Sequence, residues 1–299
     1  MREKKEKKQE KLYLSDRPPL GPAGKIGLAI SYILIAAWAV AIVWPLTLMV
    51  ISSFNGNQGK NISMTSDFVF SLKNFRYLFE KTYFADWVKN TIVIAGCTAF
   101  LTLLMVSLTG YAYSRYHFKG KKASLMTILL IQSIPTFAGI TAYYTMHSIL
   151  NAAMPFFTRQ ALLILIYTGG GIASNTYILK GYIDSISSEL DEAARIDGCS
   201  NYQIYRLIIM PIARPMLAII ALWSFIGPFM DFMMPQILLT SPKEYTLATG
   251  LFSLIRDTRT MNQPAFAAGG LLTAIPIIIL FISLQGQLVS GLSQGSVKG

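Results

Sequence analysis

One short stretch of the sequence combines acidic and small side chains in a pattern suited to docking a protein partner. Glu192 is followed by Ala193 and Ala194, and Asp197 is followed by Gly198. Small side chains let the backbone of a partner approach closely, and a carboxylate can accept a bidentate pair of hydrogen bonds from a partner's arginine. These residues therefore predict a contact surface for another protein.

The residues around this pattern predict a short helix that ends in a tight turn. Ser188 is a candidate N-cap, and acidic residues follow it in the first turn. Leu190, Ala193 and Ala194 recur at the spacing of one helical face. Gly198 would end this helix.

A second short helix is predicted directly after the turn. Ser200 and Gln203 have the spacing of a capping box, in which each side chain bonds to the backbone N–H of the other. Four residues then recur at the spacing of one helical face: Ile204, Leu207, Ile208 and Pro211. Pro211 and Pro215 are expected to end or kink this helix.

Sequence motifs for an enzyme or a nucleotide site do not occur in the chain. There is no G-x-x-x-x-G-K-[ST] string to cradle ATP phosphates, no H-E-x-x-H and no G-x-S-x-G. The two histidines, His117 and His147, stand singly. We therefore predict no catalytic residue, no metal site and no cofactor bound by this chain, and we expect any ATPase to be a separate polypeptide.

The composition indicates that this pattern belongs to a membrane protein. Apolar residues make up 53% of the 299 residues and charged residues 14%, against about 25% in soluble domains. The mean hydropathy is +0.47. Cys97 and Cys199 cannot form a disulfide framework. The net charge of +11 is concentrated at the N-terminus, beside a long apolar segment, which favours a topology signal over a nucleic-acid site.

Six windows without charged residues, one of them interrupted by Asp231, predict the membrane spans, because a helix needs about 20 apolar residues to cross the bilayer. The fold class is thus an all-α integral membrane protein with six transmembrane helices and a cytoplasmic helix-turn-helix between spans four and five. The six-span domain covers 26–292, and the helix-turn-helix lies in the segment 184–214. The expected spans are 26–51, 88–112, 123–147, 160–180, 213–235 and 269–290.

The distribution of basic residues predicts the orientation of these spans. The loop between spans two and three holds a dense basic cluster, whereas the next loop holds only Arg159. The cluster consists of Arg115, Lys119, Lys121 and Lys122. Since short cytoplasmic loops are enriched in Lys and Arg, both termini should be cytoplasmic, with a basic tail at 1–25 and a short tail at 291–299.

Other residues could meet a substrate or a partner at the outer side. Asp231 lies late in span five, where a carboxylate at mid-bilayer would cost about 2.5–3.5 kcal/mol, so it needs water, a partner or the outer boundary. It could line the substrate path, or lie at the outer boundary or the subunit interface. The outer loop 52–86 predicts an amphipathic helix lying on the membrane, and the loop 240–268 carries aromatic and amide side chains.

The docking pattern resembles the EAA loop of ABC-type import permeases. The likeness rests on Glu192-Ala193-Ala194, on Asp197-Gly198 and on the stretch 208–211, which ends in proline. It extends to 244–248, 266–269, 274–276 and the tail 291–299. Within the family, the chain resembles most the MalG-type subunit of maltose and maltodextrin importers.

The resemblance implies which residues couple the chain to an ATPase. In the family, the EAA loop docks in a cleft of the nucleotide-binding subunit, and the C-terminal tail reaches toward the ATPase dimer. The expected coupling residues are Glu192, Ala193, Ala194, Asp197, Gly198 and Pro211. The expected tail contacts are Gln294 and Lys298.

The implied function is that of a permease subunit in an ATP-driven, binding-protein-dependent ABC importer of the bacterial cytoplasmic membrane, carrying maltose or maltodextrin. Its partners would be a homologous second permease, two ATPase subunits, an extracytoplasmic solute-binding protein, the oligosaccharide and membrane lipid, but no nucleic acid. An importer of another oligosaccharide, such as a galactan-derived one, is the first alternative. An ion-coupled secondary transporter is a further one, although only Asp231 supplies an intramembrane ionisable residue.

Overall fold

The regular elements of the chain are helices, as predicted. The computed structural model describes residues 21–59, 61–62 and 67–295, and in this part of the chain the only strand-like feature is an isolated bridge between Asn55 and Phe70. The all-α fold class is therefore confirmed for these residues. Most of the basic tail predicted at 1–25 lies outside them.

Among the residues that the structure describes, four helices are long and apolar enough to cross a membrane. They are α3 (Pro22–Phe54), α5 (Phe84–Arg115), α8 (Arg159–Asp184) and α15 (Gln263–Gly295). They cover the predicted first, second, fourth and sixth spans. The chain divides into two compact units, 1–51 and 52–299, so most of α3 belongs to a unit of its own.

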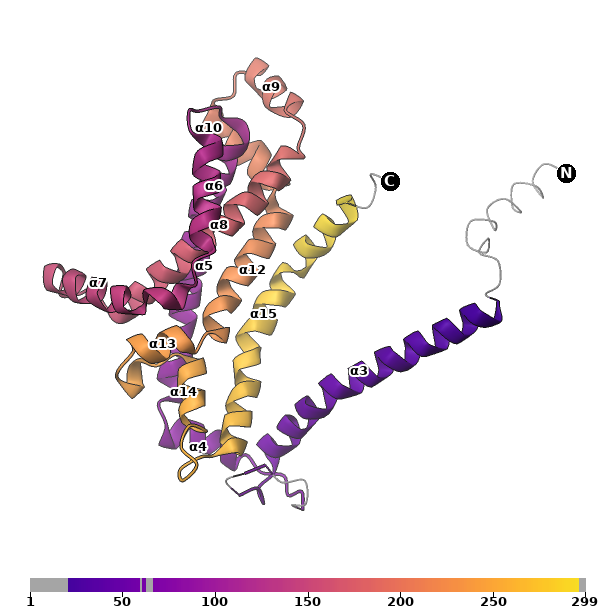
Figure 1. Ribbon diagram of the computed structural model, residues 1–299, viewed down its shortest axis with the longest axis vertical. Helices are drawn as coiled ribbons and strands as arrows, with labels where there is room; N and C mark the ends of the chain where they lie inside the picture. The colour runs from indigo at the N-terminus through magenta and orange to yellow at the C-terminus, as the bar shows by residue number, and fades with distance from the viewer. Residues whose placement is uncertain (1–20, 60, 63–66, 296–299) are drawn as a thin grey trace. The chain divides into compact units, whose positions relative to one another are not determined.

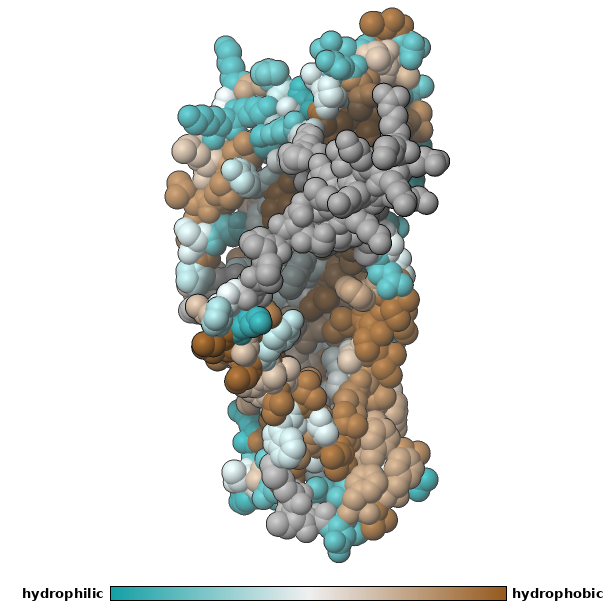
Figure 2. All heavy atoms as spheres, turned by 90° about the vertical axis from the view of Figure 1, so that its right-hand side faces the viewer, coloured by the Kyte–Doolittle hydropathy of each residue, from teal (hydrophilic) through white to brown (hydrophobic). Residues whose placement is uncertain are grey.

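The second unit is organised around α5. Helix α8 and helix α12 (Arg214–Met230) pack against α5, and α15 packs against α12 and against the short helix α4 (Lys73–Lys81). Figure 1 shows α5, α8, α12 and α15 side by side, with α9 and α10 at one end and α4 and α14 at the other. Figure 2, which draws both units, shows many brown, hydrophobic residues on the surface that faces the viewer, with teal, hydrophilic residues at the upper and lower ends of the picture.

The predicted third span, 123–147, is wrong as a single continuous helix. The segment forms α6 (Lys121–Gln132), a 3₁₀ turn η1 (Thr136–Gly139) and α7 (Ile140–Ala153). Pro135 has no N–H to donate and its ring disfavours helical backbone at the residue before it, so α6 ends just ahead of it. At about 1.5 Å per residue, α6 is too short to cross a hydrocarbon core of about 30 Å.

The predicted fifth span, 213–235, also ends earlier than expected. Helix α12 stops at Met230, Asp231 is extended, and a separate helix α13 (Met233–Leu238) follows. One Asp231 carboxylate oxygen accepts hydrogen bonds from the N–H groups of Met233 and Met234, at 2.9 and 3.3 Å. Helix α12 therefore ends where the backbone of Asp231 becomes extended, and the Asp231 side chain bonds to the first turn of α13. With the bent pair 201–212 and 214–230, the described residues hold up to five spans by length and composition, and a sixth stays a prediction.

The end of the second unit opposite α9 has a tightly packed core around Trp87. The Trp87 indole N–H donates to the Pro242 carbonyl at 2.7 Å, and the ring is 3% exposed. Gly250, in helix α14 (Leu247–Ser253), lies directly against this ring. The predicted outer amphipathic helix is present nearby as α4, with Asn74 and Leu78 buried.

Replacing Gly250 with alanine is expected to destabilise this core. A Cβ atom there would lie 2.1 Å from Trp87 Cδ2, and the ring cannot move without losing its hydrogen bond. Overpacking of this kind costs about 1–3 kcal/mol. Thermal unfolding of the purified chain measures the loss. Gly227→Ala, inside α12 with nothing within 4 Å of the new Cβ, is the control and should not lower the midpoint, because alanine favours a helix more than glycine does. Equal midpoints for the two variants would contradict the packing.

Candidate functional site

The predicted hairpin between spans four and five is present, and its turn depends on Gly198. Helix α9 (Glu189–Ile196) ends in a Schellman motif, in which Cys199 N–H donates to Ala194 O at 2.9 Å and Gly198 N–H donates to Arg195 O at 3.1 Å. This motif needs a left-handed residue, and Gly198 has φ +83°. The predicted tight glycine turn is confirmed.

The start of α9 differs from the prediction. Ser188 has helical backbone and makes no capping hydrogen bond with its side chain. Instead the Ser187 hydroxyl accepts from Glu189 N–H at 3.3 Å. The cap therefore moves one residue toward the N-terminus, because Ser188 already belongs to the first turn.

The second helix begins as predicted and then widens. The capping box of Ser200 and Gln203 is complete, and it starts α10 (Asn201–Gln203). The chain continues as a π-helical stretch, η2 (Ile204–Ile209), and then as α11 (Met210–Ile212). Pro211 offers no N–H and crowds the carbonyl one turn earlier, which favours an extra residue in the turn.

The wider turn changes which residues of the second helix are buried. Ile204 and Ile209, five residues apart, are fully buried, whereas Leu207 is 64% exposed. The predicted face through Leu207 was wrong because it assumed a regular α-helix. The predicted face of α9 is also wrong at Leu190, which is 44% exposed, because this regular helix turns Asp191 and Ala194 inward, where Asp191 meets Arg115.

The six predicted coupling residues do not all face outward. Four are exposed: Glu192, Ala193, Asp197 and Gly198. Ala194 is 5% exposed and packs in the core beneath the hairpin, and Pro211 is half-buried. The small side chain of Ala194 thus serves packing within this chain. Only the four exposed residues are open to a partner.

Apolar side chains are also exposed on this hairpin. Ile196 is 88% exposed and Tyr202 is 63% exposed. Leu190 and Leu207 are exposed too, and all four residues belong to α9, α10 and η2; α9 and α10 lie at one end of the second unit (Figure 1). Exposed apolar side chains rimmed by polar ones are typical of a protein interaction surface.

Arg115, the last residue of α5, joins this hairpin to two long helices. Its Nε lies 2.5 Å from Asp191 Oδ2 on α9, and the two side chains are only 12% and 8% exposed. The same guanidinium donates to the backbone carbonyls of Ile183 at 3.2 Å and Ile186 at 3.0 Å, where α8 ends. Our sequence interpretation used Arg115 only as a topology signal, since nothing in the spacing pairs it with Asp191.

Further contacts tie the same elements together. Ser114 donates to the Asp184 carboxylate at 2.6 Å, and Asp184 also pairs with Lys180. The hydroxyls of Ser107 on α5 and Tyr205 on η2 lie 2.9 Å apart. Both halves of the hairpin are therefore bonded to α5. A displacement of the hairpin would strain these bonds and so pull on the end of α5.

Asp231 lies far from the hairpin, at the other end of α12. One carboxylate oxygen starts α13, and the other accepts from the Tyr167 hydroxyl at 2.9 Å. Both oxygens thus have partners within the chain, and a role of Asp231 in the substrate path stays a prediction. Gln294 lies in the last turn of α15, and Lys298 lies outside the described residues, so the tail contacts also stay predictions.

The described residues offer no other evident chemical centre. Among them, no group of three His, Cys, Asp or Glu side chains is placed to hold a metal ion. The fold and the hairpin define a class: an α-helical membrane protein with a helix-turn-helix bonded to the ends of its long helices. Residues 105–294 match the family described as "Binding-protein-dependent transport system inner membrane component", and the chain belongs to this family.

Individual relatives agree with this assignment. The chain is 39% identical over 269 residues to the maltodextrin transport system permease protein MdxG of Bacillus subtilis, covering 90% of this chain and 95% of MdxG. It is 41% identical over 278 residues to the galactooligosaccharides transport system permease protein GanQ of the same organism, covering 92% and 96%. The predicted resemblance to maltodextrin permeases is therefore confirmed.

The fold is also that of a solved transporter. A chain of a bacterial ABC transporter involved in the import of the acidic polysaccharide alginate aligns with a TM-score of 0.75, covering 90% of this chain and 99% of that one. At 19% identity, this likeness concerns the fold alone.

Proposed function

We propose that the chain is one permease subunit of an ATP-driven importer that carries maltose or maltodextrin across the cytoplasmic membrane. The family assignment supports the transport role, and the name of MdxG supports the substrate class. The similar identity to GanQ favours galactooligosaccharides as the second candidate. Both termini would face the cytoplasm, because the basic loop that begins at Arg115 is expected to stay on the cytoplasmic side.

The observation that carries the coupling proposal is the bonding of the hairpin to α5 and α8 through Arg115. A separate ATPase subunit would bind the exposed residues around Glu192 and Gly198, and ATP would be held by that partner. When ATP binding closes a pair of ATPase subunits, the hairpin would move as a rigid lever. Its bonds would pass the movement to the long helices, so that this chain and a second permease change the side on which their cavity opens.

A solute-binding protein would deliver the sugar at the opposite end, near α4 and α14.

Reconstitution tests this function: proteoliposomes containing the chain, its neighbouring permease, ATPase and binding protein are supplied with ATP and labelled maltotriose. We expect uptake that stops when this chain is omitted. Uptake of a galactooligosaccharide but not of maltotriose would replace the substrate class. Uptake driven by an ion gradient without ATP would contradict the importer itself.

Replacing Glu192 with lysine is expected to weaken co-purification of the ATPase. Glu192 is exposed on α9, and the family resemblance places a basic cleft against it, so the variant sets like charges together. Pull-down of the ATPase with tagged permease measures the effect, which we expect to be about tenfold or more. The matched control is Glu80→Lys in α4, an exposed glutamate at the other end; equal losses in both variants would argue against docking at Glu192.

A further inference from the structure

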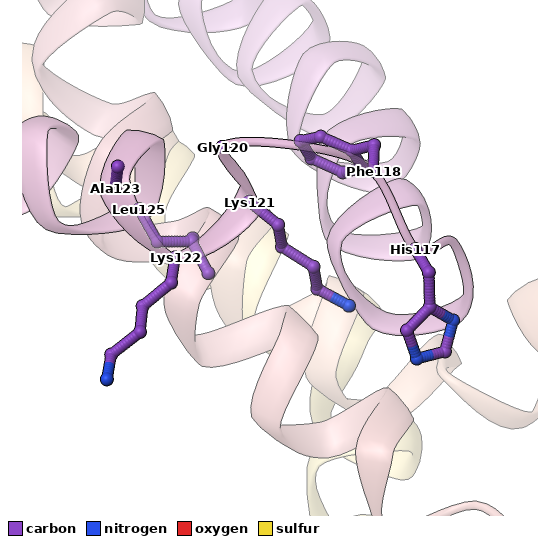
Figure 3. Close-up of a pocket in the computed structure, with 7 residues that line it drawn as sticks. All are labelled: His117, Phe118, Gly120, Lys121, Lys122, Ala123 and Leu125. Carbon is purple, nitrogen blue, oxygen red and sulfur yellow. The ribbon is translucent and has the colours of Figure 1, made fainter.

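A hollow of about 500 Å³ opens beside the first turn of α6 and is separate from the hairpin's exposed residues. Its lining includes His117, Phe118, Lys121, Lys122 and Leu125. Figure 3 shows Lys121 extending toward His117, while Lys122 extends away on the other side of the helix start. Two lysines thus contribute to a lining whose other residues are mostly apolar.

The hollow lies where the long apolar helices end. Lys121 Nζ donates to the carbonyl of Tyr116 at 3.0 Å, directly after the last residue of α5. At the same level, Ser114 near the end of α5 donates to Asp184, the last residue of α8. Because both helices are long enough to cross a membrane, this level corresponds to a membrane boundary, where lipid headgroups lie.

Part of the positive charge beside the hollow has no acidic partner among the described residues. The stretch 115–122 contains no acidic residue. Lys122 lines the hollow, and Lys119 lies in the chain between two lining residues, Phe118 and Gly120. Both lysines are exposed, and neither forms an ion pair with a residue that the structure describes. An anionic group is therefore the complementary ligand, since basic residues at a membrane surface attract anionic headgroups.

An apolar strip continues from the hollow along α6. Lys122, Met126 and Leu130 are four residues apart and so share one face of the helix. Met126 is 58% exposed and Leu130 is 69% exposed. A positive charge followed by exposed apolar side chains matches a lipid, with its phosphate at the lysines and its acyl chains along the strip, whereas a free phosphate would not need the strip.

We infer that this hollow binds the headgroup of an anionic phospholipid, with acyl chains lying along Met126 and Leu130. Native mass spectrometry of the full chain, titrated with dioleoyl phosphatidylglycerol or dioleoyl phosphatidylcholine, tests the inference. We expect one more phosphatidylglycerol than phosphatidylcholine to be retained at high collision energy. In the variant Lys119→Gln/Lys122→Gln, retention of that lipid should fall roughly 30-fold. Lys121 is left in place because it bonds to the carbonyl of Tyr116.

Two further variants distinguish a lipid site from a general attraction between charges. Lys243→Gln/Arg256→Gln removes the same charge from exposed positions elsewhere in the chain and should retain the lipid; an equal loss there would show that only net charge matters, and would overturn the inference. Met126→Ser/Leu130→Ser should weaken retention even though all lysines remain. Displacement of the lipid by soluble glycerol 1-phosphate at equal concentration, or unchanged retention in the lysine variant, would likewise overturn it.

Discussion

Replacing Arg115 with alanine is expected to abolish uptake. The change leaves the Asp191 carboxylate buried without its cation, and it removes the donors to the carbonyls of Ile183 and Ile186. Breaking a buried ion pair by removing one partner costs about 3–5 kcal/mol. The hairpin would then no longer be fixed to α5 and α8. Uptake and ATP hydrolysis, both measured in proteoliposomes and normalised to inserted chain, report the effect.

A positioning role for Arg115 predicts a particular ratio of these two activities. The exposed docking residues stay intact, so ATP hydrolysis should persist while uptake is lost. Arg115→Lys keeps the charge but cannot bond to Asp191 and both carbonyls at once, and it should give intermediate uptake. Arg115→Ala/Asp191→Ala should cost less than the sum of the two single changes, because it leaves no unpaired buried charge. Strict additivity, or a normal ratio of uptake to hydrolysis, would contradict the role.

Replacing Gly198 with valine is expected to reduce uptake roughly tenfold or more. The residue adopts φ +83°, which costs an L-residue about 1–2 kcal/mol and a β-branched one more. No atom lies within 4 Å of the position a Cβ would take, so the cost comes from the backbone and not from a clash within the chain. The chain should therefore still insert, and ATP-dependent uptake measures the loss.

Asparagine at the same position separates backbone conformation from side-chain size. Gly198→Asn tolerates the left-handed region and should retain more uptake than Gly198→Val. Gly181→Val in α8, where the added Cβ also meets nothing within 4 Å, serves as the control and should transport normally. Normal uptake by Gly198→Val would show that the turn has no part in coupling.

The local features of the hairpin could be predicted because their causes lie within a few residues. The capping box of Ser200 and Gln203 and the positive φ of Gly198 depend only on neighbouring backbone groups. The buried face of the second helix could not be predicted in the same way. Pro211 pointed only to an end or kink, whereas the backbone responded by widening a turn, which moved burial from Leu207 to Ile209.

Long-range contacts and span ends were less accessible to sequence reasoning. Counting charge-free windows measures how apolar a segment is and ignores Pro135, which breaks the predicted third span. Asp231 was weighed as a charge in the membrane, but its hydrogen bonds to the start of α13 make it a helix-starting residue. The pairing of Arg115 with Asp191 requires α5 and α8 to end at the same level, which only the packed structure reveals.

The central claim is that the exposed hairpin docks an ATPase, and photo-crosslinking from α9 tests it most directly. Ile196 is 88% exposed, so a photoreactive phenylalanine analogue there should be tolerated in the assembled transporter. We predict an ATPase–permease adduct whose yield changes when ATP is added, and no such adduct from Phe79, which is 58% exposed on α4. An ATPase adduct from Phe79 and none from Ile196 would contradict the account.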